Sequence, residues 1–155
     1  MNLILLQPCD LLDERTARIT GRRLAHIREA HRAAPGDTLR VGLENGRLGA
    51  GRVQALSAEA VELELSLTEN PPTPLPIVLL LALPRPKVFR RVLQCAVTMG
   101  VKRIALFGAW RVEKSYWQTP WLAGSDLHDQ VGLALEQACD TIPPPITTHP
   151  LFKPF

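Results

Sequence analysis

The chain has 155 residues, of which 46% are hydrophobic, and a formal net charge of +3 at pH 7. This length can form one domain or two small ones and is sufficient to bury a hydrophobic core. The longest apolar run has seven residues, far too few for a membrane span, and the first six residues lack the basic flank of a signal peptide.

Neither disulfide nor zinc chemistry is indicated by the sequence. Cys9, Cys95 and Cys139 are far apart and show no CxxC spacing. We therefore expect reduced thiols, a cytoplasmic location, no metal site and no membrane association. The histidines show no HExxH spacing, so surface or capping positions are expected for them: His26, His31, His128 and His149.

The first part of the chain predicts a short strand followed by a helix. Leu3–Leu6 is apolar throughout. Thr20 can cap a helix in which Leu24, Ile27 and His31 share one face. Four arginines lie on its other faces, opposed by a single glutamate: Arg22, Arg23, Arg28 and Arg32.

Three strands are predicted next, at Thr38–Leu43, Arg47–Leu56 and Ala60–Leu67. Between the first two, Asn45-Gly46 is typical of a tight hairpin turn in which both residues have positive φ. Two glycines inside the second strand indicate a bulge or a close backbone approach: Gly49 and Gly51. The third strand alternates strictly between apolar and polar residues, which predicts one buried face and one exposed face.

A proline-rich segment divides the chain. Four prolines between Asn70 and Pro76 predict a stiff, polyproline-like connector. We therefore expect a β-rich domain at residues 1–70, a linker at 71–76 and a second domain at 77–155.

The second domain begins with a strand–helix–strand pattern. Ile77–Leu83 is an unbroken apolar run, which favours a strand covered on both faces, as in a parallel sheet. A helix is expected from Lys87 to Met99, ended by Gly100, and a second buried strand from Arg103 to Phe107. Together these segments predict a right-handed βαβ unit and a mixed α/β fold for the whole chain.

Positive charge is concentrated in this second region. Between Pro71 and Ser115 the sequence has eight cations and only one acid, Glu113. Such a surplus indicates an anionic partner, above all a nucleic acid. A solvated helix face with capping residues is the alternative explanation for any one of these side chains.

The last third of the chain combines aromatic residues with a helix and a strand. All three tryptophans occur within residues 108–124, beside Arg111 and Lys114: Trp110, Trp117 and Trp121. They either anchor the loop to the domain or form a platform for stacking bases or for a partner subunit. We expect a helix over residues 125–139 and a strand over residues 146–151, in a sheet with an uncovered edge.

Four segments in this order resemble the RsmE family, the ribosomal RNA small-subunit methyltransferase E proteins of the SPOUT superfamily. The first is H-I-R-x-x-H-R-x-x-x-G-D-x-L at His26–Leu39, and the second is L-A-L-P-R-P-K at Leu81–Lys87. The others are Q-x-A-V-T-M-G-V-K-R-I at Gln94–Ile104 and A-L-E-Q-A-C at Ala134–Cys139. The similarity extends over nearly the whole chain.

The resemblance implies a PUA-like β-barrel at the N-terminus and a SPOUT-type α/β domain that ends in a trefoil knot. It also implies a homodimer that uses S-adenosylmethionine to methylate N3 of a uridine in small-subunit ribosomal RNA. By position and charge, the residues expected to contact RNA are Arg22, Arg23, Arg28, Arg32, Lys87, Arg90 and Arg91.

The sequence departs from the family in three places. The glycine-rich and leucine-rich loops that form the family's cofactor pocket do not occur in it. The residues after Pro84 read R-P-K-V-F-R where the family has a glycine and an acid, and Asp140 stands where the family has arginine. We therefore expect a fragment or a degenerate member that binds no cofactor and is inactive by itself, and no catalytic residue is identified.

Two other functions remain open from the sequence. The chain could be a non-catalytic module whose barrel and basic helix bind ribosomal RNA. It could also be an interaction protein in which the aromatic loop forms a dimer surface.

Overall fold

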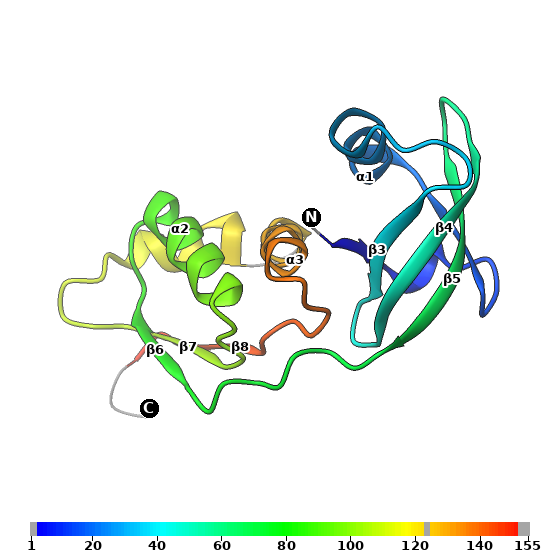
Figure 1. The fold of residues 1–155 in the computed structure, drawn as a ribbon. Coiled ribbons are helices and arrows are strands. Elements are labelled where there is room, and N and C mark those ends of the chain that lie inside the picture. Colours follow the sequence, from blue (N-terminus) through cyan, green and yellow to red (C-terminus); the bar gives the residue numbers. More distant parts are fainter. Residues whose placement is uncertain (1–2, 123–124, 152–155) are drawn as a thin grey trace. The chain divides into compact units, whose positions relative to one another are not determined.

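The computed structural model describes residues 3–122 and 125–151 (Figure 1). The chain falls into two compact units. Unit 1 comprises residues up to Pro72 together with Cys139–Thr141, and unit 2 comprises Thr73–Ala138 together with the residues from Ile142 onward. Within the described residues, no helix has both the length and the apolar character that a membrane crossing requires.

Unit 1 is a curled five-stranded sheet with a short helical segment. Its strand order is β1-β3-β4-β5-β2, in which β1 is parallel to β3 and the other neighbours are antiparallel. The strands are β1 (Ile4–Leu6), β2 (Thr16–Ile19), β3 (Thr38–Leu43), β4 (Leu48–Leu56) and β5 (Val61–Glu69). The helical segment consists of α1 (Gly21–His26) and a π-helical turn (Ile27–His31).

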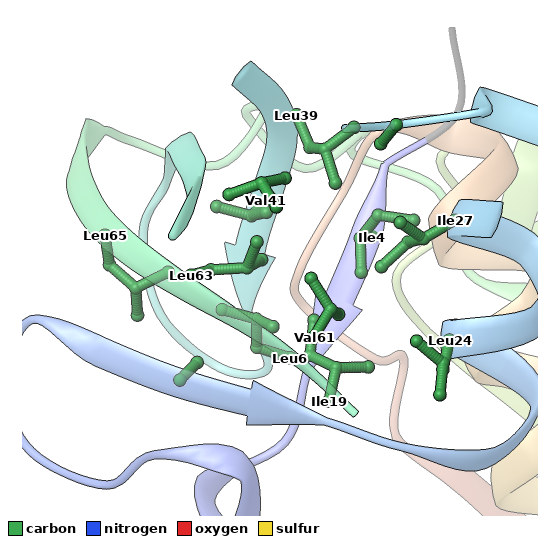
Figure 2. Close-up of a cluster of buried hydrophobic side chains, with 13 residues drawn as sticks. Ile4, Leu6, Ile19, Leu24, Ile27, Leu39, Val41, Val61, Leu63 and Leu65 are labelled. Carbon is green, nitrogen blue, oxygen red and sulfur yellow. The ribbon is translucent and has the colours of Figure 1, made fainter. Parts of the chain in front are cut away.

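The core of unit 1 follows the sequence alternation. In β5, Val61, Leu63 and Leu65 are buried while the intervening side chains are more exposed, as predicted. These side chains belong to one buried cluster with Leu24 and Ile27, which Figure 2 shows pointing into it from the helical segment. The helical segment is therefore fixed by its apolar face, and its polar face remains on the surface.

The turn between β3 and β4 differs from the prediction. Asn45 has a φ of 59°, but Gly46 is not among the described residues with positive φ, and four residues separate the two strands. The turn forms at these residues, with the Gly46 N–H donating to the Leu43 carbonyl oxygen at 2.8 Å, but the predicted positive φ at Gly46 is wrong. Thr141 contacts this turn: its backbone carbonyl accepts from the Asn45 N–H (2.8 Å), and its hydroxyl donates to the Gly46 carbonyl (2.6 Å).

One glycine of β4 is required by a close backbone approach, as expected. A Cβ at Gly49 would lie 1.9 Å from the carbonyl oxygen of Ser66 on the neighbouring strand. The β4–β5 register shifts at the same point, between Leu48 and Gly49. The predicted bulge is confirmed there.

Strand β2 was not predicted from the sequence. Its two buried residues, Ala17 and Ile19, alternate with Thr16 and Arg18. An alternation over only four residues is too short to distinguish a strand from a loop. The strand forms because it pairs antiparallel with β5, which lies far along the chain.

Unit 2 is a three-stranded parallel sheet with two helices. The strand order is β6-β7-β8, with β6 (Leu79–Ala82), β7 (Ile104–Phe107) and β8 (Ile146–His149). The helices are α2 (Pro86–Thr98) and α3 (Ser125–Ala138), and two 3₁₀ turns lie between β7 and α3, at Lys114–Gln118 and Pro120–Leu122. Because β6 and β7 are parallel and joined by α2, the predicted βαβ connection is confirmed.

One face of this sheet is open, contrary to the expectation for Ile77–Leu83. Helices α2 and α3 lie on the same side of the strands (Figure 1). Leu80 is 53% exposed, and Thr147, which the parallel register places on the same face, is also exposed, whereas the small Ala105 between them on the central strand is buried. The sequence correctly predicts a parallel strand, but no described helix covers its second face.

Candidate nucleic-acid interface

Three of the four predicted arginines of unit 1 lie on its surface. Leu24 and Ile27 face the core, so the neighbouring positions of the same helical segment face outward. Arg22, Arg28 and Arg32 are exposed. Arg32 follows the π-helical turn with a φ of 51°, which ends the helix at that residue.

Arg23 is different, because its guanidinium is held inside unit 1. Its Nη1 donates to the Leu5 carbonyl oxygen at 2.8 Å and to Asp10 Oδ2 at 2.5 Å, and its Nη2 donates to Asp10 Oδ1 at 2.8 Å. The side chains of Arg23 and Asp10 are only 16% and 8% exposed. A bidentate pair of this kind joins the helical segment to the turn after β1.

A surface pocket of about 530 Å³ lies beside the exposed arginines. Arg28 lines it, but so do two carboxylates, Glu29 and Glu59. This pocket therefore has mixed charge. The positive surface of unit 1 is therefore discontinuous at this point, and the pocket is not a purely cationic cavity.

The basic residues of helix α2 form the second predicted group. Its buried stripe is Phe89, Leu93, Ala96 and Val97, which turns Lys87, Arg90 and Arg91 outward, and all three are exposed. The first turn of α2 also contains Pro86 at the start of the helix, as the sequence indicates. The basic face is therefore a direct consequence of the amphipathic pattern.

A pocket of about 500 Å³ in unit 2 was not predicted as a site. It lies where β7 and β8 end, and its lining residues are Gly108, Ala109, Trp110, Val112, Lys114, Trp117, Gln118, Pro150 and Leu151. Ligands of open α/β sheets commonly bind beyond the carboxyl ends of the strands. The sequence signal for it was the aromatic cluster, although the side chain of Trp121 lies outside the described residues.

A family model described as an RNA methyltransferase domain matches residues 71–155. The chain belongs to this family. The matched segment is more than half of the chain and covers nearly the whole of unit 2. The resemblance to the RsmE family is confirmed.

Solved structures share the fold across both units. Ribosomal RNA small subunit methyltransferase E from Neisseria gonorrhoeae, bound to S-adenosyl methionine, matches 96% of this chain with a TM-score of 0.70 and 21% identity. A methyltransferase from Legionella pneumophila in complex with the same cofactor matches 96% with a TM-score of 0.70 and 17% identity. A predicted RNA methyltransferase from Thermotoga maritima matches the whole chain with a TM-score of 0.66 and 15% identity.

The chain is shorter than these relatives. It spans 62% of the length of the first two structures and 67% of the third. The comparison with curated protein sequences finds no match. At these identities, the likeness to solved structures establishes the fold.

S-adenosylmethionine is the cofactor of this family, but the described residues do not fit it. The molecule carries a sulfonium cation and a ribose, and a carboxylate commonly holds ribose hydroxyls. Among the described residues that line the unit 2 pocket, the only charged side chain is Lys114, which suits the cofactor's own carboxylate but neither its ribose hydroxyls nor its sulfonium. The exposed basic residues of unit 1 and of α2 offer no carboxylate either, so no cofactor-binding residue is assigned.

No catalytic group stands out in the described part of the chain. It contains no cluster of histidine, cysteine, aspartate and glutamate suited to a metal ion. His31 is half-buried and contacts His26, with ring centroids 5.0 Å apart in an edge-to-face arrangement. Asp140, where the family has arginine, is buried in unit 1 and accepts from the Thr141 N–H at 2.7 Å, so it faces away from solvent.

Proposed function

We propose that the chain is the N-terminal portion of an RsmE-type enzyme that methylates N3 of a uridine in small-subunit ribosomal RNA. One observation carries the proposal: the RNA methyltransferase family model covers residues 71–155. It is supported by the Neisseria gonorrhoeae methyltransferase E structure, whose fold matches 96% of the chain. S-adenosylmethionine would supply the methyl group.

We propose a separate role for each part of the chain. Residues 1–70 act as a PUA-like barrel that holds RNA, residues 71–76 as a linker, and residues 77–155 as the first part of a SPOUT-type domain. The exposed cations proposed to bind phosphates are Arg22, Arg28, Arg32, Lys87, Arg90 and Arg91. Arg23 is proposed to act indirectly, because its guanidinium is bound to Asp10 and Leu5.

The proposed reaction requires a group that handles the N3 proton of uridine, and no such group is assigned within residues 1–155. Methylation replaces the N3–H bond of uridine by an N3–CH₃ bond, so a base must take the proton or the resulting anion must be stabilised. We place both the base and the cofactor pocket in sequence beyond residue 155. The 155 residues alone are therefore proposed to bind RNA without transferring methyl groups. The complete enzyme is proposed to be a cytoplasmic homodimer.

The test uses two proteins: residues 1–155, and the product of the complete reading frame in which they occur. Each is incubated with radiolabelled S-adenosylmethionine and small-subunit ribosomal RNA, and the nucleosides are analysed by mass spectrometry. We expect 3-methyluridine from a longer product and none from residues 1–155. A longer product that binds the cofactor but methylates another base or another RNA would contradict the proposed substrate.

A second function is favoured by the misfit between the described residues and the cofactor. If the reading frame ends at Phe155, the chain is proposed to be a non-catalytic module that binds ribosomal RNA. Calorimetry of this chain with S-adenosylmethionine should then show no binding. Clear binding would mean that a cofactor site exists within these 155 residues and would contradict both assignments.

A further inference from the structure

The unit 2 pocket presents an indole ring to solvent. Trp110 is 99% exposed, although burial of an indole is strongly stabilising. Of the two explanations for the aromatic cluster, the loop anchor therefore does not apply to this residue. Half-buried Trp117 lines the same pocket and can serve as an anchor. A fully exposed aromatic ring beside a pocket is typical of a binding surface.

The charge around this ring favours an anion. Lys114 lines the pocket and Arg111 follows Trp110 directly in the chain. Glu113 is the one acid of the loop and does not line the pocket. Gln118 lines it with an amide group, which can both donate a hydrogen bond to a base edge and accept one from it.

The floor of the pocket is rigid backbone. The Gly108 N–H donates to the carbonyl oxygen of His149, the last residue of β8, at 2.9 Å, which continues the β7–β8 pairing one residue beyond β7. A Cβ at Gly108 would lie 2.0 Å from the Pro150 carbonyl oxygen, so only glycine permits this approach. The volume of about 500 Å³ lies within the range of roughly 300–1,000 Å³ that is usual for small-ligand sites.

We infer that this pocket is a stacking subsite for an unpaired RNA base. The base stacks on the Trp110 indole, Lys114 neutralises a neighbouring phosphate, and Gln118 contacts the base edge. Stacking of bases on aromatic side chains is the usual way in which proteins hold single-stranded RNA, and it tolerates any base. The inference rests on the RNA binding proposed above and adds the chemistry of one contact.

The experiment measures binding of this chain to a single-stranded ten-nucleotide RNA and to a blunt-ended RNA duplex that contains the same strand and has no unpaired base. The variants are Trp110→Ala, Trp110→Phe and Lys114→Ala. Met99→Ala is the matched control, because Met99 is also a large exposed apolar residue of unit 2. Sedimentation of each variant without RNA reports self-association.

We expect Trp110→Ala to weaken binding of the single strand about tenfold, within the usual range for loss of one stacked base, and to leave the salt dependence unchanged. Trp110→Phe should retain most of the affinity, because a phenyl ring still stacks. Lys114→Ala should weaken binding and lower the salt slope by about 0.7. Met99→Ala should have no effect, and none of the Trp110 variants should alter binding of the duplex.

Two results would overturn the inference. In the first, Trp110→Ala binds the single strand as the unsubstituted chain does. In the second, Trp110→Ala abolishes self-association and leaves RNA affinity intact, which would make this face an interface between copies. Failure of the unsubstituted chain to bind any RNA at low salt is a different result, because it would refute the proposed function itself.

Discussion

The hydroxyl of Thr141 donates a hydrogen bond to the Gly46 carbonyl oxygen at 2.6 Å, although 95 residues separate them in sequence. Thr141 is fully buried in unit 1, and its own carbonyl accepts from the Asn45 N–H. Gly42 provides the space, since a Cβ there would lie 2.5 Å from Thr141 Cγ2. Residues from the far part of the chain are therefore part of unit 1 and shape its β3–β4 turn.

This relationship predicts that Gly42→Ala destabilises unit 1 and that Thr141→Ser relieves the effect. The added methyl should cost about 1–3 kcal/mol of the free energy of unfolding, as overpacking usually does. Serine keeps the hydroxyl but removes the colliding Cγ2. Hydrogen exchange of β3 and β4 amides is the measurement for unit 1, because all tryptophans occur in residues 108–124. Equal costs of Gly42→Ala in both backgrounds would disprove the contact.

The pair of Arg23 and Asp10 predicts that two neighbouring arginines behave differently. Arg23→Ala leaves the buried Asp10 carboxylate without its cationic partner, with only the Gln7 N–H still donating to it, so it should lower the free energy of unfolding by about 3 kcal/mol. Arg28→Ala removes an exposed side chain and should change stability by less than about 0.5 kcal/mol. Urea denaturation followed by circular dichroism measures both. The effect on RNA affinity should be the opposite. Under conditions in which both variants are folded, Arg28→Ala should bind RNA more weakly than Arg23→Ala.

The basic face of α2 predicts a defined salt dependence of RNA binding. Lys87→Ala and Arg91→Ala should each lower affinity and reduce the slope of log K against log salt by about 0.7, because one phosphate contact is lost. Arg40→Ala is the control: it removes the same charge from an exposed pair with Glu69 in unit 1. Binding titrations at several salt concentrations give the slopes. Unchanged slopes for both α2 variants would exclude this face from the interface.

Local patterns predicted the elements that are determined locally. The alternation in β5 and the four-residue spacing in α2 each gave the correct element within two residues of its ends. Gly100 ends α2 with a φ of +83°, as its position implied. In these segments, each side chain faces the core or solvent according to its position in the element alone.

The features missed from sequence depend on distant partners. β2 is a strand because β5 pairs with it, and Arg23 is internal because Asp10 and Leu5 meet its guanidinium. The helical period does not reveal that Asp10 and Leu5 bind Arg23. It predicts the same exposed position for Arg23 as for Arg22 and Arg28. The same holds for Trp110, since composition alone does not distinguish an anchoring indole from an exposed one.

The contact between His26 and His31 predicts a pH-dependent stability of unit 1. Burial, and then the neighbouring charge of His26, lower the pKa of His31 below its ordinary value of 6.5. Between the lowered pKa and 6.5, the unfolded chain binds more protons than the folded chain does, so the free energy of unfolding rises with pH. The stability that neutral His31 contributes is therefore lost progressively as the pH falls below 6.5. Relative to pH 8, His31→Gln should lose less stability on acidification to about pH 5. His26→Gln should show part of this effect, and parallel curves for all three proteins would contradict it.

The closest backbone approach in unit 2 predicts that Gly108→Ala disturbs the fold and the pocket together. Its Cβ would lie 2.0 Å from the Pro150 carbonyl oxygen, and this backbone atom cannot rotate away as a side chain could. The free energy of unfolding of unit 2 should therefore fall by about 2–3 kcal/mol, the upper part of the range for overpacking. Tryptophan fluorescence during urea denaturation measures it, because the tryptophans belong to this unit. Ala109→Ser, at an exposed neighbouring position, should leave the transition unchanged. If Gly108→Ala were as stable as the unsubstituted chain, the backbone at Pro150 would have to move at little cost. The rigid pocket floor that is proposed to position a base against Trp110 would then not exist.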